Sequence, residues 1–126
     1  MRAEKFLKSV KHLSMETKAL TGALETIKKE YEAVSGTNRV SDELLLRKNE
    51  LQAEVSSRLA YIYKLKKELI TAISRVKSEQ ERAVLTMYYV NNMTNEKIAE
   101  ELCYDERSIY RIHKKATASL DAVLNG

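Results

Sequence analysis

Two long stripes of apolar residues, separated by a single break, limit most strongly the folds open to this 126-residue chain. Both stripes recur at alternating steps of four and three residues, the spacing of a heptad repeat. The first comprises Phe6, Val10, Leu13, Thr17, Leu20, Leu24, Ile27, Tyr31 and Val34. The second comprises Leu44, Lys48, Leu51, Val55, Arg58, Ile62, Leu65, Leu69, Ala72 and Val76, widened by Leu45, Leu59 and Ile73. These patterns predict two long helices, each with a narrow apolar seam.

The break between the stripes, residues 35–40, reads SGTNRV. Gly36 suits a left-handed cap at the end of the first helix, and Ser41, followed by Asp42 and Glu43, suits the start of the second. Two similar seams joined by a short loop predict an antiparallel helical hairpin. Neither helix can bury its seam alone, so the seams either pack against each other or close a bundle by self-association or with a partner helix.

Several residues in these helices have two interpretations. Gly22 either weakens its helix by about 1 kcal/mol relative to Ala, or marks a kink or a close approach between helices. Lys48 and Arg58 are expected at the seam edges or extended outward, because a buried charge is costly. A run of basic residues is either a solvated face or a patch that contacts phosphates; it comprises Lys64, Lys66 and Lys67.

The composition favours an all-α protein that is not an enzyme. The chain has no Pro, three Gly and 32% charged residues, a profile typical of helices. Its single cysteine, Cys103, excludes an internal disulfide and is interpreted as a small apolar filler. The two histidines, His12 and His113, have no metal-ligand spacing; His113 is expected to pack between helices rather than contact phosphate. A Cys103 and His113 nucleophile pair lacks an orienting partner, and no Gly-rich phosphate loop is present, so we expect no catalytic residues, metal or cofactor.

No apolar run of about 18 residues occurs, and the N-terminal residues lack the apolar core of a signal peptide. We therefore expect no membrane span and a cytoplasmic location. The net charge of +4 and the pI near 9.1 are weak evidence for an acidic partner. Residues 79–126 hold six basic against eight acidic side chains, so any acidic partner must be bound by one face of that segment.

After residue 77 the pattern changes to shorter helices. Ser78 and Glu81 form a capping-box pattern for a helix over about residues 78–90, which could also continue the second long helix. Asn91, Asn92 and Met93 form a turn. Two further helices are expected: one capped by Thr94 and ending near Leu102, and one capped by Asp105 and ending near Leu124.

The last of these helices has two sharply different sides. Because successive helical residues are rotated by about 100°, Ile112, Ala116 and Leu120 fall within about 60° of Ile109. Three basic residues fall on the opposite side, at angles of about 160°, about 200° and about 140° from Ile109, namely Arg107, Arg111 and Lys114. The preceding helix carries a matching apolar patch of Ile98, Ala99 and Leu102, and the two helices together predict a helix-turn-helix.

This arrangement predicts a DNA-binding surface, with an ordinary solvated basic face as the alternative. A helix fits the major groove, and Arg107 and Arg111, one turn apart, would reach base edges. Lys114 and Lys115 would meet phosphates. Thr94 begins a helix whose free amides could bind a phosphate oxygen.

The segment ERAVLTMYYVNNMTNEKIAEELCYDERSIYRIHKKATASL resembles region 4 of sigma-70-type factors. The stretch YRIHKKA and the chain length are similar to small phage or prophage transcriptional regulators of Gram-positive bacteria, of the ArpU and RinA type. The resemblance implies that the final helix reads a promoter element and that a nearby surface touches RNA polymerase. It places DNA contacts on Glu106, Arg107, Tyr110 and Arg111, although Glu106 could repel phosphates and Tyr110 could instead pack against a neighbour. Such turns often carry Gly where this chain has Cys103, which implies strain or a different turn.

No segment supplies the exposed aromatics that a complete sigma factor uses to open a promoter, so an activator or accessory regulator is favoured. The sequence thus predicts a helical hairpin over residues 1–77 and a helix-turn-helix domain over residues 78–126. The candidate DNA-binding residues are Thr94, Glu106, Arg107, Ser108, Tyr110, Arg111, Lys114 and Lys115.

The predicted function is control of transcription at promoters, as a late-gene activator of a phage or prophage acting with host RNA polymerase. The expected partners are double-stranded DNA, RNA polymerase and a second copy bound through the N-terminal helices, in the cytoplasm of a bacterial host and at its nucleoid. Two alternatives remain. One is a coiled-coil adaptor for a protein partner; the other is a DNA-packaging protein like a small terminase subunit, although those usually place the DNA-binding helices before the coil.

Overall fold

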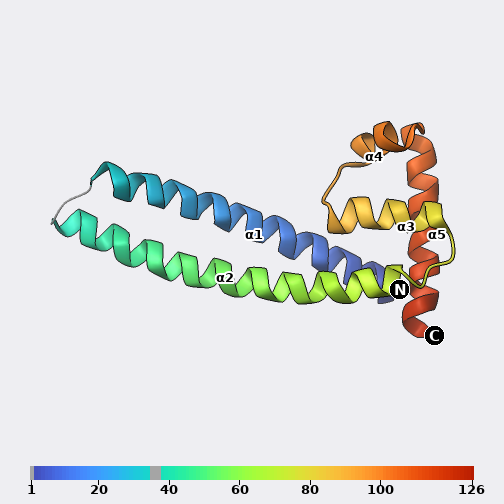
Figure 1. The fold of residues 1–126 in the computed structure, drawn as a ribbon, viewed down its shortest axis with the longest axis horizontal. Coiled ribbons are helices and arrows are strands. Elements are labelled where there is room, and N and C mark those ends of the chain that lie inside the picture. Colours follow the sequence, from blue (N-terminus) through green and yellow to red (C-terminus); the bar gives the residue numbers. More distant parts are fainter. Residues whose placement is uncertain (1, 35–37) are drawn as a thin grey trace. The chain divides into compact units, whose positions relative to one another are not determined.

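The computed structural model describes residues 2–34 and 38–126, and every regular element in that part of the chain is helical (Figure 1). The elements are α1 (Arg2–Ala33), α2 (Arg39–Ile73), α3 (Glu79–Leu85), the π-helical turn η1 (Thr86–Val90), α4 (Asn95–Leu102) and α5 (Glu106–Asn125). The predicted all-α class is confirmed. The expected cap at Gly36 lies outside the described residues. None of the described helices combines the length and apolar character needed to cross a bilayer.

The chain forms two compact units. We call His12–Tyr63 the middle unit, and Met1–Lys11 with Lys64–Gly126 the terminal unit. The sequence predicts a different boundary, between a helical hairpin over residues 1–77 and a helix-turn-helix domain over residues 78–126. That boundary stays a prediction.

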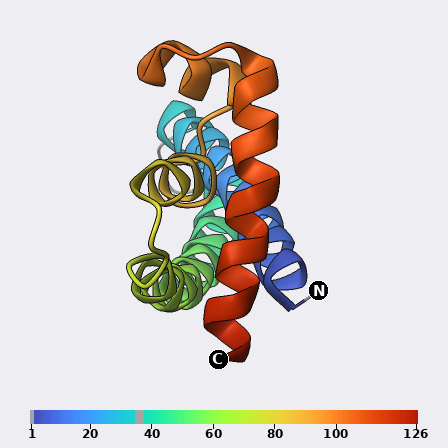
Figure 2. The ribbon, with the colours of Figure 1, turned by 90° about the vertical axis from the view of Figure 1, so that its right-hand side faces the viewer.

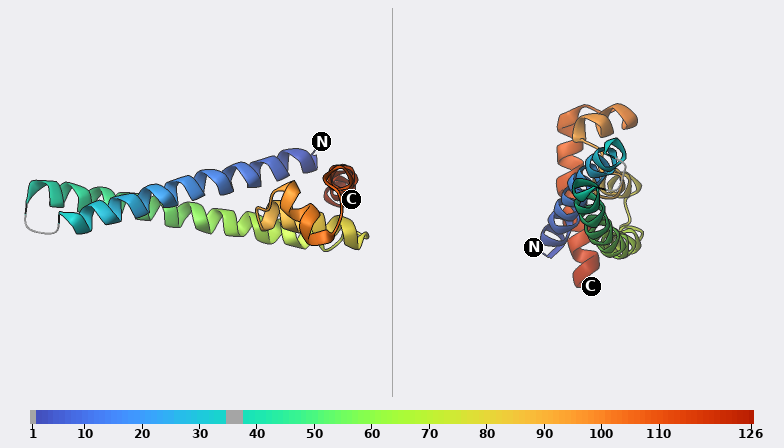
Figure 3. Two further views of the ribbon diagram at one scale, coloured as in Figure 1. Left: turned by 90° about the horizontal axis from the view of Figure 1, so that it is seen from above. Right: turned by 90° about the vertical axis from the view of Figure 1, so that its left-hand side faces the viewer.

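In the middle unit, the two helical segments lie side by side and run in opposite directions (Figures 1 and 3). Their shared seam buries Thr17 and Leu24 of α1 and Val55 and Ile62 of α2. Each residue at the four-three positions of the two predicted stripes is buried or half-buried. The heptad spacing therefore identified the packing face of both helices correctly.

Two charged seam residues of the middle unit lie at its edges, as expected. Arg58 Nη1 lies 2.8 Å from Glu16 Oε1 on α1, and Arg58 Nη2 lies 3.2 Å from Glu54 Oε1 on its own helix. Lys48 Nζ lies 5.3 Å from the centre of the Tyr31 ring. Each cation thus has a partner at the rim of the seam and stays partly in water.

Three predictions about α2 were wrong. Leu45 and Leu59 do not widen the seam, because 37% and 51% of their surfaces are exposed. The helix begins at Arg39 and not at Ser41, because the Asn38 side chain accepts a hydrogen bond from the Ser41 amide at 2.8 Å. An asparagine oxygen satisfies that amide as well as a serine would, so the helix begins two residues earlier.

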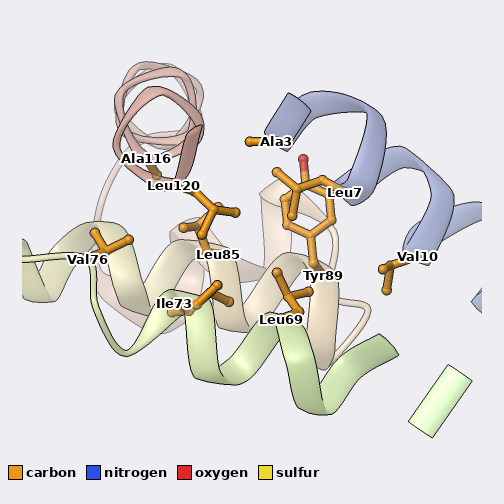
Figure 4. Close-up of a cluster of buried hydrophobic side chains, with 11 residues drawn as sticks. Ala3, Leu7, Val10, Leu69, Ile73, Val76, Leu85, Tyr89, Ala116 and Leu120 are labelled. Atoms are coloured by element: carbon orange, nitrogen blue, oxygen red, sulfur yellow. The ribbon is translucent and has the colours of Figure 1, made fainter. Parts of the chain in front are cut away.

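The terminal unit is built around a core to which both ends of the chain contribute (Figure 4). The core comprises Ala3, Leu7 and Val10 of α1, Leu69, Ala72 and Ile73 at the end of α2, Val76 in the connection that follows, Leu85 and Tyr89, and Ala116 and Leu120 of α5. The first turn of α1 is also tied to α5, because the Ala3 amide donates to Asp121 Oδ1 at 3.0 Å. Residues 2–11 are therefore part of the same core as α5.

The segment after α2 begins as the sequence predicts, with one difference. Helix α2 ends at Ile73 and α3 begins at Glu79, so the two helices are separate. The Ser78 side chain accepts from the Glu81 amide, as expected for an N-cap. The reciprocal half of the predicted capping box is replaced, since the Glu81 carboxylate accepts a hydrogen bond from the Ser119 hydroxyl of α5.

The single helix expected over residues 78–90 consists of two parts, the α-helix α3 and the wider π-helical turn η1 that follows it. Two lysines donate to its carbonyl oxygens: Lys11 Nζ to Tyr88 at 3.1 Å and Lys66 Nζ to Val90 at 3.0 Å. Lys66 is half-buried, so it belongs neither to a free solvated face nor to a free phosphate patch, in contrast to both predictions. The exposed Lys64 and Lys67 leave both interpretations open.

Candidate nucleic-acid interface

Helices α4 and α5 are joined by a three-residue turn, and each begins at the predicted cap. The Thr94 hydroxyl accepts from the Lys97 amide at 3.1 Å, and Asp105 Oδ1 accepts from the Ser108 amide at 2.7 Å. Both caps satisfy amides that the first helical turn leaves free. The turn consequently holds the start of α5 in a defined place beside α4, where Figure 2 shows it.

Cys103 ends α4 in the left-handed conformation, with φ 58° and ψ 41°. The Tyr104 amide donates to Ala99 O at 2.9 Å and the Cys103 amide to Glu100 O at 3.3 Å, the two bonds of a Schellman motif. The turn therefore has the shape that usually carries Gly, and the chain accepts the strain. The prediction that Cys103 fills apolar space was wrong, because its side chain is exposed.

The apolar side of α5 is buried as its sequence predicts. Ile109, Ala116 and Leu120 are fully buried, and Ile112 is 8% exposed. Ile109 and Ile112 share a cluster with Val84 of α3 and with Ile98 and Ala99 of α4. Both shorter helices therefore support α5 from one side.

The opposite side of α5 carries most of the candidate DNA-binding residues. Six of them are exposed to solvent: Glu106, Arg107, Tyr110, Arg111, Lys114 and Lys115. Ser108 is half-buried at the edge of this surface. Thr94 is exposed but caps the start of α4, so it is not part of the exposed side of α5. We call the surface formed by Arg107, Tyr110, Arg111, Lys114 and Lys115 the basic face of α5.

Among the described residues, the four cations of the basic face form no salt bridge. These cations are Arg107, Arg111, Lys114 and Lys115. Arg111 Nη2 has a weak contact to Ser108 Oγ at 3.4 Å. These side chains therefore keep donors free for an external acceptor, as recognition of phosphate or of guanine requires.

The preceding helix α4 carries exposed acidic residues. Glu96, Glu100 and Glu101 are exposed, and Lys97 Nζ pairs with Glu100 at 3.6 Å. At the turn, hydrogen bonds from Ser108 lower the pKa of Asp105, and Arg107 and Arg111 lower it further. Four of the six Lys and Arg side chains of residues 79–126 thus lie on the basic face of α5, which explains how a net acidic segment can present a basic surface.

His113 packs between helices, as predicted. Its Nε2 lies 2.6 Å from the Tyr89 hydroxyl, and the Tyr88 ring packs edge-on at 4.8 Å. Burial lowers the pKa of His113, with a smaller effect from the charge of Lys11, while burial raises the pKa of Tyr89 to about 12. The neutral imidazole and the neutral phenol therefore share one hydrogen bond, with the tautomer of His113 setting which group donates.

A groove between the start of α3 and the flank of α5 was not predicted. It is lined by Gln80, Glu81, Tyr104, Ser108, Arg111, Ile112 and Lys115. Gln80 Nε2 donates to the Tyr104 hydroxyl, which joins the turn after α4 to α3. The sequence gives no signal for this contact because 24 residues separate the two side chains. We call this surface the α3–α5 groove.

The described residues hold no group of three or more His, Cys, Asp or Glu side chains placed to bind a metal ion. The surface described above is carried by a chain whose described regular elements are all helical. The chain belongs to the family described as "Protein of unknown function (DUF1492)", whose family model matches residues 24–121. Comparison with curated proteins and with solved structures finds no match.

Proposed function

We propose that this protein is a sequence-specific DNA-binding regulator of transcription that inserts α5 into the major groove. The observation that carries the proposal is the two-sided burial of α5. Ile109 and Ile112 are held in the core while Arg107 and Arg111, on the opposite side, are exposed and form no salt bridge among the described residues. A buried apolar side positions a helix rigidly, and free guanidinium groups are suited to bidentate contacts with guanine.

In this proposal α4 and α5 form a helix-turn-helix, and residues 78–126 are the DNA-binding domain. The Schellman turn at Cys103 and the Asp105 cap support it, because they set a short, fixed connection between the two helices. The resemblance to region 4 of sigma-70-type factors and to ArpU and RinA type regulators adds to this support. Residues 1–77 then form the helical hairpin, which could also join two copies.

The side chains of α5 have different proposed roles along the helix. Arg107 and Arg111, in its first two turns, read base edges, and Lys114 and Lys115 contact phosphates. The amides at the start of α4, beside Thr94, donate to a phosphate of the flanking backbone.

Tyr110, 58% exposed, is available to a base or a sugar. Glu106 and Ser108 lie beside the arginines in the sequence. The Glu106 carboxylate accepts a hydrogen bond from a cytosine amine and avoids contact with a phosphate, which carries the same charge.

The resemblance further suggests control of promoters together with host RNA polymerase, as in activation of late genes of a phage or prophage. Selection of bound sequences from random duplex DNA, run with and without bacterial RNA polymerase, tests both parts. Enrichment of one motif by the protein alone supports autonomous recognition, and enrichment only with polymerase supports a region 4-like accessory role. The proposal is wrong if neither selection enriches a motif.

A second candidate function, an adaptor that binds a protein partner, is favoured by the exposed apolar residues of the middle unit. Leu46, Leu59 and Tyr63 are 62%, 51% and 72% exposed on α2. Single exposed apolar residues are common, but Leu59 and Tyr63 lie one helical turn apart and form a small adjacent pair, which favours a protein contact. If the protein is an adaptor, Leu59→Glu is expected to abolish regulation in cells, while the purified variant binds DNA like the parent protein. Regulation that is unaffected by both Leu59→Glu and Tyr63→Glu would exclude the adaptor function.

A further inference from the structure

The α3–α5 groove borders the basic face of α5 and was not among the predicted contacts. We propose that it binds one backbone phosphate of the duplex that α5 enters, with Lys115 and Tyr104 as the main contacts. This inference rests on the proposed DNA-binding function and adds Tyr104 and Gln80 to its surface.

The position of the groove suits a phosphate rather than a base. Lys115 and Ser108 line the groove on the flank of α5 that faces α3. Arg111, which reads bases in the proposed function, borders the groove from the middle of the basic face, and its charge acts on both. Arg107 is not among the lining residues and lies at the middle of the basic face, almost opposite the buried Ile109. A helix about 10–12 Å wide fills a major groove about 12 Å wide, so its centre faces bases and its flank faces a phosphate backbone.

The charge of the groove matches one phosphate. Arg111 and Lys115 contribute two positive charges, and the Glu81 carboxylate contributes one negative charge. Glu81 is held by the Ser119 hydroxyl, so it is a fixed part of the wall. The remaining single positive charge would be balanced by the single negative charge of a phosphodiester.

Neutral donors complete the groove. Tyr104 is 42% exposed, and its backbone is fixed by the bond from its amide to Ala99 O. Its hydroxyl accepts from Gln80 Nε2, which leaves the phenolic proton free to donate outward. A hydroxyl donor and an ammonium group that line the same groove suit the non-bridging oxygens of a phosphodiester.

Binding of the selected duplex at several salt concentrations tests the inference with four variants. Lys115→Gln is expected to weaken binding roughly five- to tenfold near 0.1 M salt and to lower the salt slope by about 0.9, the effect of one phosphate contact. Tyr104→Phe, which removes only the hydroxyl, is expected to weaken binding at least about threefold. Glu81→Gln, which can still accept from Ser119, is expected to strengthen binding. Tyr63→Phe, an equally conservative change in the middle unit, is the control and is expected to have no effect.

Duplexes with a single methylphosphonate, which removes the charge of one phosphate, locate the contact. A methylphosphonate at one position of the duplex is expected to weaken binding by the parent protein. The same change is expected to have little further effect on binding by Lys115→Gln or by Tyr104→Phe. Parental affinity and salt slope in both variants, with site discrimination still lost in Arg107→Ala, would overturn the groove and leave the proposed function intact. No sequence preference in the parent protein would overturn both.

Discussion

The conformation of Cys103 is the clearest local cost in the proposed interface. A residue other than Gly in the left-handed region costs about 1–2 kcal/mol, and Cys103 has no short polar side chain to reduce that cost. Asn92 also has a positive φ of 56°, but asparagine tolerates this region better. The strain at Cys103 therefore reflects a turn whose shape is set by the packing of α4 and α5.

Replacing Cys103 with Gly is expected to stabilise the protein. The relief of about 1–2 kcal/mol exceeds the extra chain entropy of Gly in the unfolded state, about 0.5–1 kcal/mol. Urea unfolding should show a gain of about 0.5–1 kcal/mol in the free energy of unfolding. Asn92→Gly should give a smaller gain, and a loss of stability in Cys103→Gly would show that the cysteine side chain has a packing role.

His113 should make stability depend on pH. Its pKa in the folded protein is lowered, so the unfolded chain binds a proton more readily and stability rises with pH. The contribution is complete above the ordinary histidine pKa of about 6.5 and is lost as the pH falls through the lower folded value. Urea unfolding at pH 7.5 and 5.0 should show a smaller pH effect in His113→Gln than in the parent. An equal pH effect in both proteins would contradict the role of His113.

At the scale of whole elements, periodicity predicted the helices well because packing faces repeat along the sequence. The caps at Ser78, Thr94 and Asp105 were found because each depends on a side chain and an amide three residues later. The start of α2 was missed because Asn38 competes with Ser41 for the same role. Local signals thus locate a helix end only where one capping residue is available.

Substitution of Gly22 tests whether helix propensity alone determines how strongly this position stabilises α1. A Cβ built at Gly22 would meet no atom within 4 Å, so the expected alternative of a close helix approach was wrong. Gly22→Ala should raise the free energy of unfolding by about 1 kcal/mol, because Ala is the better helix former. The exposed neighbouring residue supplies the control: Ala23→Gly should lower stability by a similar amount. No gain in Gly22→Ala would point to a need for backbone freedom at that position.

At the scale of the whole chain, the contacts between distant segments could not be read from the sequence. The heptad pattern includes Val10 and, extended back by three residues from Phe6, reaches Ala3, but it gives no reason to bury Leu7, which faces the core shared with α5. The α3–α5 groove was missed for the same reason, since Gln80 and Tyr104 meet only in the folded chain. The basic face of α5 was predictable because a single helix carries it.

Leu7 is expected to stabilise the terminal unit although it lies about a hundred residues from α5 in the sequence. Leu7→Ala should lower the free energy of unfolding by about 2–5 kcal/mol, the range for a buried leucine that leaves a cavity. Leu46→Ala, at a position 62% exposed, should change stability by less than about 0.5 kcal/mol. Equal effects in the two variants would show that residues 2–11 do not contribute to this core.

The central claim, that α5 reads DNA sequence, is tested most directly by comparing affinities for the selected duplex and for a scrambled duplex. Arg107→Ala and Arg111→Ala are expected to remove most of the discrimination, about 1–3 kcal/mol for each lost guanine contact, while both variants stay folded. Arg47→Ala, the same change at an exposed arginine of the middle unit, should leave the ratio of affinities at its parental value. Parental discrimination in Arg107→Ala and Arg111→Ala would contradict the account.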